Sequence, residues 1–279
     1  MIVASHTGML VPCVLMSSKS LTVHSILPPL LTATVDRVLI DAAMRHVAHG
    51  DANPVQAAAA AATDPQARVV IGPCRSRDVA EALEVTAPAG LAMIAPIATW
   101  AGVTRDDEPG CEDHPARGSG TVFRLVARDS VVAQRIATRV RDAGHRAVVI
   151  AGDHEYGVQL DAQLAMSGLP RVSAADADVI VLAGLAGHEE IARARSLAPL
   201  PIIAFDGVQP ERFPRQQVLL TRVYAVTNEA VGTPEARRAA ELAVAALVQG
   251  GNTSETLREL GGFDDHGDLL DPDVRFESY

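Results

Sequence analysis

The sequence predicts an α/β protein built from doubly wound parallel sheets, because short apolar runs alternate with Ala-rich helical stretches along most of its 279 residues. The apolar runs are uninterrupted, as in 68–72 (RVVIG) and 147–151 (AVVIA), which is typical of parallel strands covered on both faces. The stretches between them carry apolar residues at helical spacing. These units are too many for one sheet, so we expect two lobes.

The expected elements follow from these runs and spacings. Strands are expected at 21–27, 45–49, 68–72, 91–95, 122–126, 147–151, 179–182 and 202–205. Helices are expected at 34–43, 57–62, 77–87, 130–143, 157–165, 189–197 and 234–249. The tract at 57–62 is assigned to a helix because alanine has the highest helix propensity. Residues 106–120, with Pro, Gly and mixed charges, are expected to form a surface loop.

Composition and charge exclude several classes of protein. The net charge of −10 argues against a nucleic-acid partner, which requires a basic face. The three cysteines, Cys13, Cys74 and Cys111, are widely spaced and predict reduced thiols rather than a disulfide framework. The run Cys111-Glu112-Asp113-His114 resembles a metal-binding corner, but it has no paired ligand set elsewhere and is expected to be a solvated loop. We expect no metal and no cofactor.

The amino-terminal segment bears on where the protein works. Residues 9–16 are apolar, but no Lys or Arg precedes them, and Pro12 interrupts the run. No small-residue cleavage site follows. No stretch reaches the ~20 apolar residues of a membrane span. As written, the sequence is therefore expected to be cytoplasmic.

Polar side chains follow several of the expected strands. Ser76, Thr99 and Asp206 each come shortly after the end of an apolar strand, and Tyr156 follows the strand at 147–151. In open α/β sheets, ligands bind at the carboxyl ends of the strands, where the amino termini of helices offer free N–H groups. This combination of hydroxyls, an acid and N–H groups suits a ligand with a carboxylate on one side and an ammonium on the other.

Several motifs between residue 51 and the end of the sequence resemble those of a known family. In order, they are IGPCRS, MIAPIAT, GDHEYGVQL, FDGV and FDDHGDLLDPDVRFESY. Together they resemble type I periplasmic binding proteins, and in particular the branched-chain amino-acid binding proteins of ABC importers. The resemblance implies a first lobe at 1–123 plus 225–262 and a second at 124–224 plus 263–279. It also implies a hinge of crossover strands near 123–126, 219–224 and 261–267.

The resemblance implies roles for individual residues. Ser76 and Thr99 would hydrogen-bond the carboxylate and ammonium of the ligand, and Ile97 would contribute backbone groups. Tyr156 would contact the ligand from the second lobe, and Asp206 would pair with the ammonium. Each residue also has a structural interpretation: Ser76 and Thr99 as helix caps, Asp206 as a turn residue before glycine, and Tyr156 as a packing residue.

Three further residues depart from the family pattern or extend it. Trp100 is a candidate wall of the cleft, although an indole more often belongs to the core. Arg75 stands where the family usually has a small polar residue, so it either favours a more anionic ligand or is simply solvated. Leu185 falls where the family often has an aromatic contact. The sequence is also shorter than typical members, which leaves the amino-acid specificity open.

The function implied by the resemblance is non-enzymatic binding of a small polar ligand, an amino acid or a related amide or carboxylate, between two lobes. The partner would be an ABC permease in an importer, whose relatives are periplasmic or extracellular, or a regulatory protein in a sensor. The resemblance also allows a homodimer. Two alternatives stay open: a ligandless relative that acts through protein contacts, and an enzyme. The enzyme would use His154 and Glu155 with Asp153 as a base, or Cys74 as an activated thiol.

Overall fold

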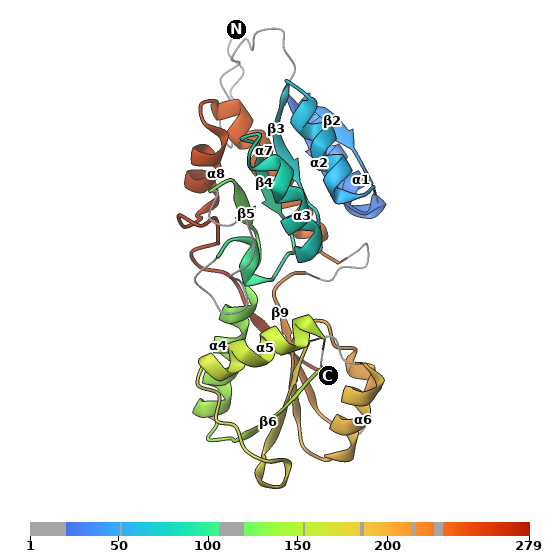
Figure 1. Ribbon diagram of the computed structural model, residues 1–279, viewed down its shortest axis with the longest axis vertical. Helices are drawn as coiled ribbons and strands as arrows, with labels where there is room; N and C mark the ends of the chain where they lie inside the picture. Colours follow the sequence, from blue (N-terminus) through green and yellow to red (C-terminus); the bar gives the residue numbers. More distant parts are fainter. Residues whose placement is uncertain are drawn as a thin grey trace, which may run out of the picture.

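The fold is described from a computed structural model, which places residues 21–50, 52–105, 120–152, 154–184, 187–213, 216–225 and 231–279. Two five-stranded sheets form two lobes, one above the other in Figure 1. Both sheets are parallel except for one edge strand, which confirms the predicted α/β class. No helix in the described part of the chain is long and apolar enough to cross a membrane.

The first lobe contains the sheet with strand order β2-β1-β3-β4-β5. Its strands are β1 (Thr22–Ser25), β2 (Arg45–Ala48), β3 (Ala67–Ile71), β4 (Ala92–Ala95) and β5 (Val122–Arg124). Its helices are α1 (Pro29–Asp41), α2 (Pro54–Thr63), α3 (Ser76–Thr86), α7 (Thr233–Gln249) and α8 (Thr253–Gly261). Helices α1 and α7 contact each other, and α2 contacts α3, each pair packing within its own apolar cluster.

The second lobe contains the sheet with strand order β10-β9-β8-β7-β6, in which β10 runs antiparallel to β9. Its strands are β6 (Ala147–Ala151), β7 (Val179–Ala183), β8 (Ile202–Ala204), β9 (Val218–Arg222) and β10 (Arg275–Ser278). Its helices are α4 (Asp129–Asp142), α5 (Glu155–Met166) and α6 (His188–Ser196). Helices α4 and α5 pack together, and α6 packs on β6 and β7. The carboxyl ends of β6 to β9 meet at one edge of the sheet.

Alanine rather than aromatic residues allows the close packing of the first lobe. Helix α7 turns a row of buried alanines toward β3, β4 and α1, among them Ala236, Ala240 and Ala243. Because alanine has no side chain beyond Cβ, the backbone of α7 can approach the sheet closely. Buried residues of the strands, such as Val69 and Ile71, have larger apolar side chains than these alanines and supply more apolar surface to the core.

The structure differs from the sequence prediction in a few elements. Helix α1 begins at Pro29 rather than at residue 34, with proline at its first turn, where the missing N–H costs nothing. Helix α8 was not predicted. Its amino terminus is capped by the side chain of Asn252, which accepts hydrogen bonds from the backbone N–H groups of Ser254 and Glu255.

The chain passes between the lobes after β5, after β9 and after α8. Arg124, which the sequence assigns to the second lobe, is the last residue of β5 in the first sheet. At this junction the carboxylate of Asp268 lies within 3.0 Å of Arg124 Nε and 2.9 Å of Arg105 Nε. It also accepts a hydrogen bond from the Thr104 hydroxyl at 2.8 Å. Residues from several crossing segments are thus held by one buried acid.

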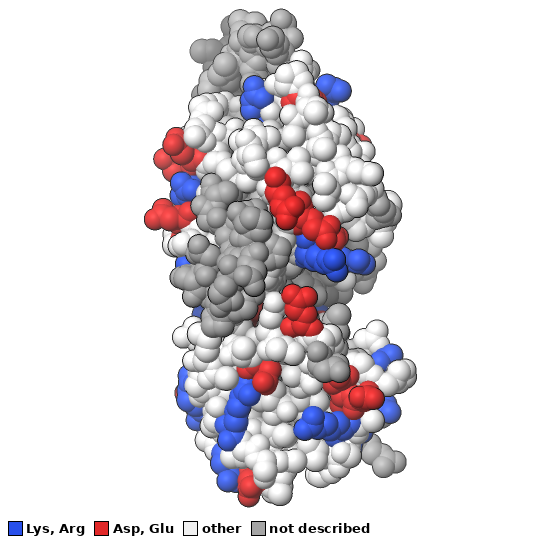
Figure 2. All heavy atoms as spheres, in the orientation of Figure 1, with Lys and Arg blue, Asp and Glu red and all other residues white. Residues whose placement is uncertain are grey.

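Charged side chains are scattered over the face of the molecule shown in Figure 2. Arg side chains lie among Asp and Glu on both lobes, and no continuous basic patch is visible among the described residues of that face. This distribution agrees with the net charge of −10.

Candidate functional site

Five side chains from both lobes gather at the carboxyl ends of the sheets, and we call them the acidic site: Thr99, Asp129, Tyr156, Asp206 and Tyr224. Thr99 follows β4 in the first lobe. Asp129 is the first residue of α4, and Tyr156 lies in the first turn of α5. Asp206 and Tyr224 come shortly after β8 and β9.

Asp129 is the centre of the acidic site. Its backbone N–H donates to the Thr99 carbonyl at 2.9 Å, which connects the second lobe to the first. Its Oδ1 accepts a hydrogen bond from the Tyr156 hydroxyl at 3.3 Å. The residue is only 4% exposed, and its Oδ2 forms no hydrogen bond with the described residues. A buried carboxylate oxygen without a donor is unfavourable, so this atom is available to a ligand.

Asp206 lies near Asp129 and raises the negative charge of the site. Burial raises the pKa of the Asp206 carboxyl, while a hydrogen bond from the Tyr224 hydroxyl opposes that rise. Arg222 also contacts this turn, donating to the Asp206 carbonyl at 3.2 Å. The pKa of Tyr224 is raised, first by burial and then by Asp206, so its hydroxyl stays protonated and donates.

The two acids together set the protonation of the site. The pKa of Asp129 is raised to about 7, first by burial and then by the charge of Asp206, while Arg124 and hydrogen bonds from Thr99 and Tyr156 lower it. The pKa of Tyr156 is raised well above its usual range for the same reasons, so it remains a neutral donor. A cationic group between the two carboxylates would relieve both their repulsion and the unpaired oxygen.

The structure brings together only some of the residues predicted to bind ligand. Thr99, Tyr156 and Asp206 are in the acidic site. The side chain of Ile97 packs against the second-lobe core, close to Gly232, where an added Cβ would lie 2.8 Å from Ile97 Cγ2. Among the described residues, no hydrogen bond is found for the backbone of Ile97.

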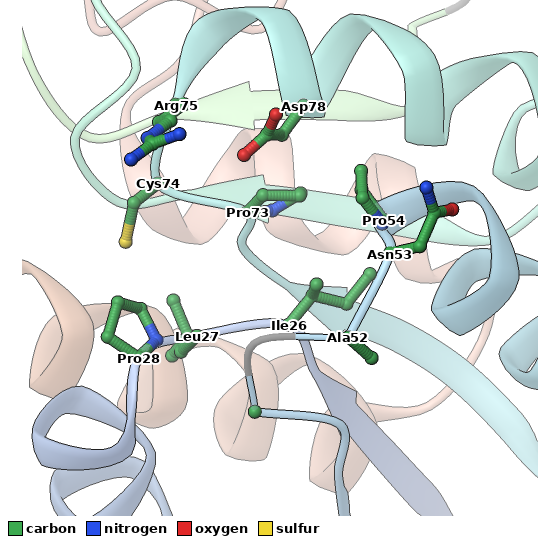
Figure 3. Close-up of a pocket in the computed structure, with 11 residues that line it drawn as sticks. Ile26, Leu27, Pro28, Ala52, Asn53, Pro54, Pro73, Cys74, Arg75 and Asp78 are labelled. Atoms are coloured by element: carbon green, nitrogen blue, oxygen red, sulfur yellow. The ribbon is translucent and has the colours of Figure 1, made fainter.

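The other predicted residues lie in the first lobe. Ser76 is not the N-cap of α3: Arg75 occupies that position, and the Ser76 hydroxyl accepts a hydrogen bond from Trp100 N at 3.1 Å. The indole of Trp100 packs against the apolar cluster under α3 and against Gly102, as expected of a core residue. Arg75 is exposed and lines a pocket of the first lobe (Figure 3).

Asp129 and Tyr224 were missed by the sequence analysis. The helix at 130–143 was expected to begin one residue too late, so Asp129 was not recognised as its first residue. An acid in the first turn of a helix that follows a buried strand is a usable signal, because it lies at the carboxyl edge of the sheet. Tyr224 fell in the segment interpreted only as a crossover.

Two of the residues considered for an enzyme, Cys74 and His154, have surroundings that the structure describes. The pKa of the Cys74 thiol is raised to about 12 by burial, the opposite of an activated thiol. The ring of His154 caps α5, its Nδ1 accepting from Gly157 N at 3.0 Å. Asp153, Leu185 and the run from Cys111 to His114 lie outside the described residues. In the part of the chain that is placed, no cluster of three His, Cys, Asp or Glu side chains could hold a metal ion.

Removing the charge of Asp129 should change how stability depends on pH. In the folded state its pKa is raised to about 7, so the folded protein holds a proton that the unfolded chain has released. The contribution of Asp129 to the free energy of unfolding is therefore fully present below pH 4 and is lost as the pH rises through 7. We therefore expect the free energy of unfolding of Asp129→Asn, taken relative to that of wild type, to rise by up to about 4 kcal/mol between pH 4 and pH 8. Urea denaturation across this range measures the difference, with the exposed Asp142→Asn on the same helix as the control. Parallel pH profiles for wild type and Asp129→Asn would contradict the assignment.

The architecture is that of the type I periplasmic binding proteins, to which the chain is structurally similar over most of its length. A substrate-binding protein of an ABC transporter from Desulfitobacterium hafniense, solved in complex with Leu, matches with a TM-score of 0.73 at 19% identity. The match covers 93% of this chain and 100% of that one. A leucine-binding protein from Thermotoga maritima matches with a TM-score of 0.67 at 16% identity, covering 92% and 97% of the two chains.

A third match extends the range of ligands among proteins of this fold. A solute-binding protein of an ABC transporter from R. palustris, in complex with 4-hydroxybenzoate, has a TM-score of 0.62 at 12% identity, covering 86% of this chain and 84% of that one. No family model matches the chain. The search of curated proteins found no match either. These similarities establish the fold, as the sequence motifs led us to expect.

Proposed function

We propose that this protein binds a small organic ligand bearing an ammonium group at the acidic site, without transforming it chemically. The ligand would be an amino acid or a related amide, held between the two lobes. Its ammonium would lie between Asp129 and Asp206, and the hydroxyls of Thr99 and Tyr156 would complete its surroundings. The role is that of a solute-binding or ligand-sensing protein.

The observation that carries this proposal is the unpaired Oδ2 of buried Asp129 beside a second, partly buried carboxyl, that of Asp206. Two acids close together in a low-dielectric site repel each other, and a buried cation with N–H donors is the group that best offsets this. The backbone of Ile97 and the Thr99 hydroxyl come from the first lobe, while both acids come from the second. A ligand that contacts both sets would favour closure of the lobes.

The structural neighbours support a binding role. Proteins of the same fold are named as substrate-binding proteins of ABC transporters, and two were solved with leucine and 4-hydroxybenzoate. By analogy, the partner of this protein is an ABC permease if it serves import, or a regulatory protein if it serves as a sensor. Fold analogy alone does not choose between these.

The proposal is tested by thermal and chemical denaturation against a panel of amino acids, amides, amines and carboxylates. The panel includes leucine, 4-methylpentanoate and 3-methylbutylamine, which share an apolar body and differ in charge. A ligand at a hundredfold its Kd should add about 2.7 kcal/mol to the free energy of unfolding. We expect the stabilising compounds to carry an ammonium group, and their affinity to rise as the pH passes 7 and Asp129 loses its proton.

The variant Asp206→Asn provides the specific arm of this test. It should weaken amine-bearing ligands by tenfold or more, about 1.4 kcal/mol, because one charged partner is lost. Asp161→Asn, a carboxyl on the second lobe that pairs with Arg171 on the surface, serves as the control and should leave binding unchanged. Binding of 4-methylpentanoate with equal affinity to wild type and Asp206→Asn, and no binding of any amine, would refute the proposal.

A further inference from the structure

Arg222 ends β9 in the second lobe, beside the turn that carries Asp206. Strands β8 and β9 run parallel, with Ala204 paired with Leu220. Continuing this register by two residues brings Arg222 next to Asp206, and Arg222 Nη1 donates a hydrogen bond to the Asp206 carbonyl oxygen at 3.2 Å. The Arg222 side chain is only 14% exposed, so this contact is largely shielded from water. The turn that holds one acid of the acidic site is therefore attached to the neighbouring strand by a side chain.

The rest of the Arg222 guanidinium is held from β10 and the residue that follows it. Arg222 Nε lies 3.2 Å from Glu277 Oε2, and Arg222 Nη2 donates to the Tyr279 hydroxyl at 3.4 Å. The Tyr279 hydroxyl in turn donates to Glu277 Oε2 at 3.0 Å. The backbone N–H of Tyr279 donates to the Val218 carbonyl at 2.9 Å, which fixes this segment against β9. All three nitrogen atoms of a planar, rigid group thus have an acceptor, which defines the orientation of Arg222.

The charges of these groups alternate. Burial lowers the pKa of Arg222, but hydrogen bonds with Tyr279 and Glu277 outweigh this effect and raise the pKa, so the guanidinium stays charged. Alone, such a cation would repel a ligand's ammonium group as well as attract the Asp206 carboxylate. The Glu277 carboxylate offsets that positive charge. The pair can therefore orient Asp206 without placing a net positive charge beside the ligand.

Several titratable groups face Asp206 besides Arg222. They are Asp129 on α4, Tyr156 on α5 and Tyr224 after β9. Asp129 is an acid and both tyrosines stay neutral, so among the described residues Arg222 is the cation that opposes the effect of burial on the pKa of Asp206. The pKa of Asp129, about 7, includes the effect of the Asp206 charge, so Asp206 loses its proton first. Arg222 favours this order.

We propose that Arg222 is a positioning residue of the acidic site, which fixes the turn after β8 so that the Asp206 carboxyl points toward a cationic ligand. Glu277 and Tyr279 act through Arg222. This role deepens the function proposed above and rests on it for the effect on ligand binding. The effect on Asp206 itself is a property of the ligand-free protein and can be measured whether or not a ligand is known.

The first measurement concerns the ligand-free protein. The Asp206 carboxyl is titrated by 13C NMR in protein labelled at aspartate, with Asp206→Asn to assign its signal. We expect Arg222→Gln to raise the pKa of Asp206 by about half a pH unit or more, because a nearby positive charge is lost. Arg222→Lys keeps the charge and should restore most of the difference. The matched control is Arg275→Gln, because Arg275 is the register partner of Arg222 on β10 but pairs with Asp273 at 3.2 Å. It should leave the pKa of Asp206 unchanged.

The second measurement is the affinity for leucine and for 3-methylbutylamine at pH 8. We expect Arg222→Gln and Glu277→Gln each to weaken binding by about threefold or more, because the Asp206 turn loses its fixed position. Arg275→Gln should leave the affinity unchanged. Glu277→Gln separates position from charge, since it should weaken binding without raising the pKa of Asp206.

Different outcomes count against the binding function and against the role of Arg222. Absence of binding by both compounds in wild type concerns the proposed function, whereas the titration of Asp206 still decides the role of Arg222. An unchanged pKa of Asp206 in Arg222→Gln, an equal shift in Arg275→Gln, or wild-type affinity in both Arg222→Gln and Glu277→Gln would overturn that role. Circular dichroism checks the fold of each variant. Should Arg222→Gln not fold, the loss of affinity in Glu277→Gln compared with Arg275→Gln decides the question.

Discussion

Gly267→Ala is expected to lower the free energy of unfolding by at least about 3 kcal/mol. This is a large effect for a substitution that adds only one methyl group. Gly267 has φ +89°, and an added Cβ would lie 1.8 Å from the Val122 carbonyl oxygen. The Gly267 carbonyl also accepts a hydrogen bond from Arg124 N at 2.8 Å, so the two segments cannot separate without losing it. Urea denaturation followed by circular dichroism measures the loss.

A matched control separates the steric clash from the cost of backbone conformation. Gly262 has φ +68°, but an added Cβ there would meet no atom within 4 Å. Gly262→Ala should therefore cost only about 1–2 kcal/mol, the penalty for an L-residue in the left-handed region. Equal losses of stability for the two variants would show that the close approach of residue 267 to the Val122 carbonyl oxygen does not affect stability.

Replacement of Asp268 is expected to have a comparable effect, about 3–5 kcal/mol, because it would leave buried cations without their partner. Asp268 is 3% exposed and lies within 3.0 Å of Arg124 Nε, while Arg124 itself is fully buried. Arg128 of the second lobe also reaches it, at 3.2 Å. Asp268→Asn keeps the shape of the side chain, so its loss of stability measures the charge.

The pH dependence of this cluster has the opposite sign to that of Asp129. Burial alone would raise the pKa of Asp268, but Arg124, Arg105 and the hydroxyl of Thr104 hold it below its usual value. Its contribution to stability is therefore present at neutral pH and is lost as the pH falls through the folded-state pKa. The exposed Asp265→Asn is the control. A loss below 1 kcal/mol for Asp268→Asn, or one equal to the control, would contradict this account.

The sequence alone predicts the sheets well, because buried parallel strands are continuous apolar runs and need no distant information. β6 occurs at the expected residues, β4 begins one residue later than expected, and β3 is shifted by one residue. Helix α8 was missed because its signal lies in a short capping sequence rather than in a long apolar period. In the sequence, Asn252 can be recognised only as a residue type that is common at helix N-caps.

The sites were predicted less completely, because their residues are far apart in the chain. Thr99, Tyr156 and Asp206 could be named from their place after strands and from the family resemblance. Asp129 was missed although its place in the first turn of a helix is a local signal, and its raised pKa depends on burial and on the nearby charge of Asp206, which no local pattern encodes. The same holds for Asp268, whose partner Thr104 is 164 positions away.

The contact between α1 and α7 has a consequence for how the chain acquires its structure. The apolar face of α1, with Leu31, Val35 and Leu39, is covered by a helix that begins only at Thr233. During synthesis on the ribosome, this face stays exposed until α7 has left the exit tunnel. The apolar core of the first lobe can therefore close only after most of the chain, including the whole second-lobe segment before α7, has been synthesised.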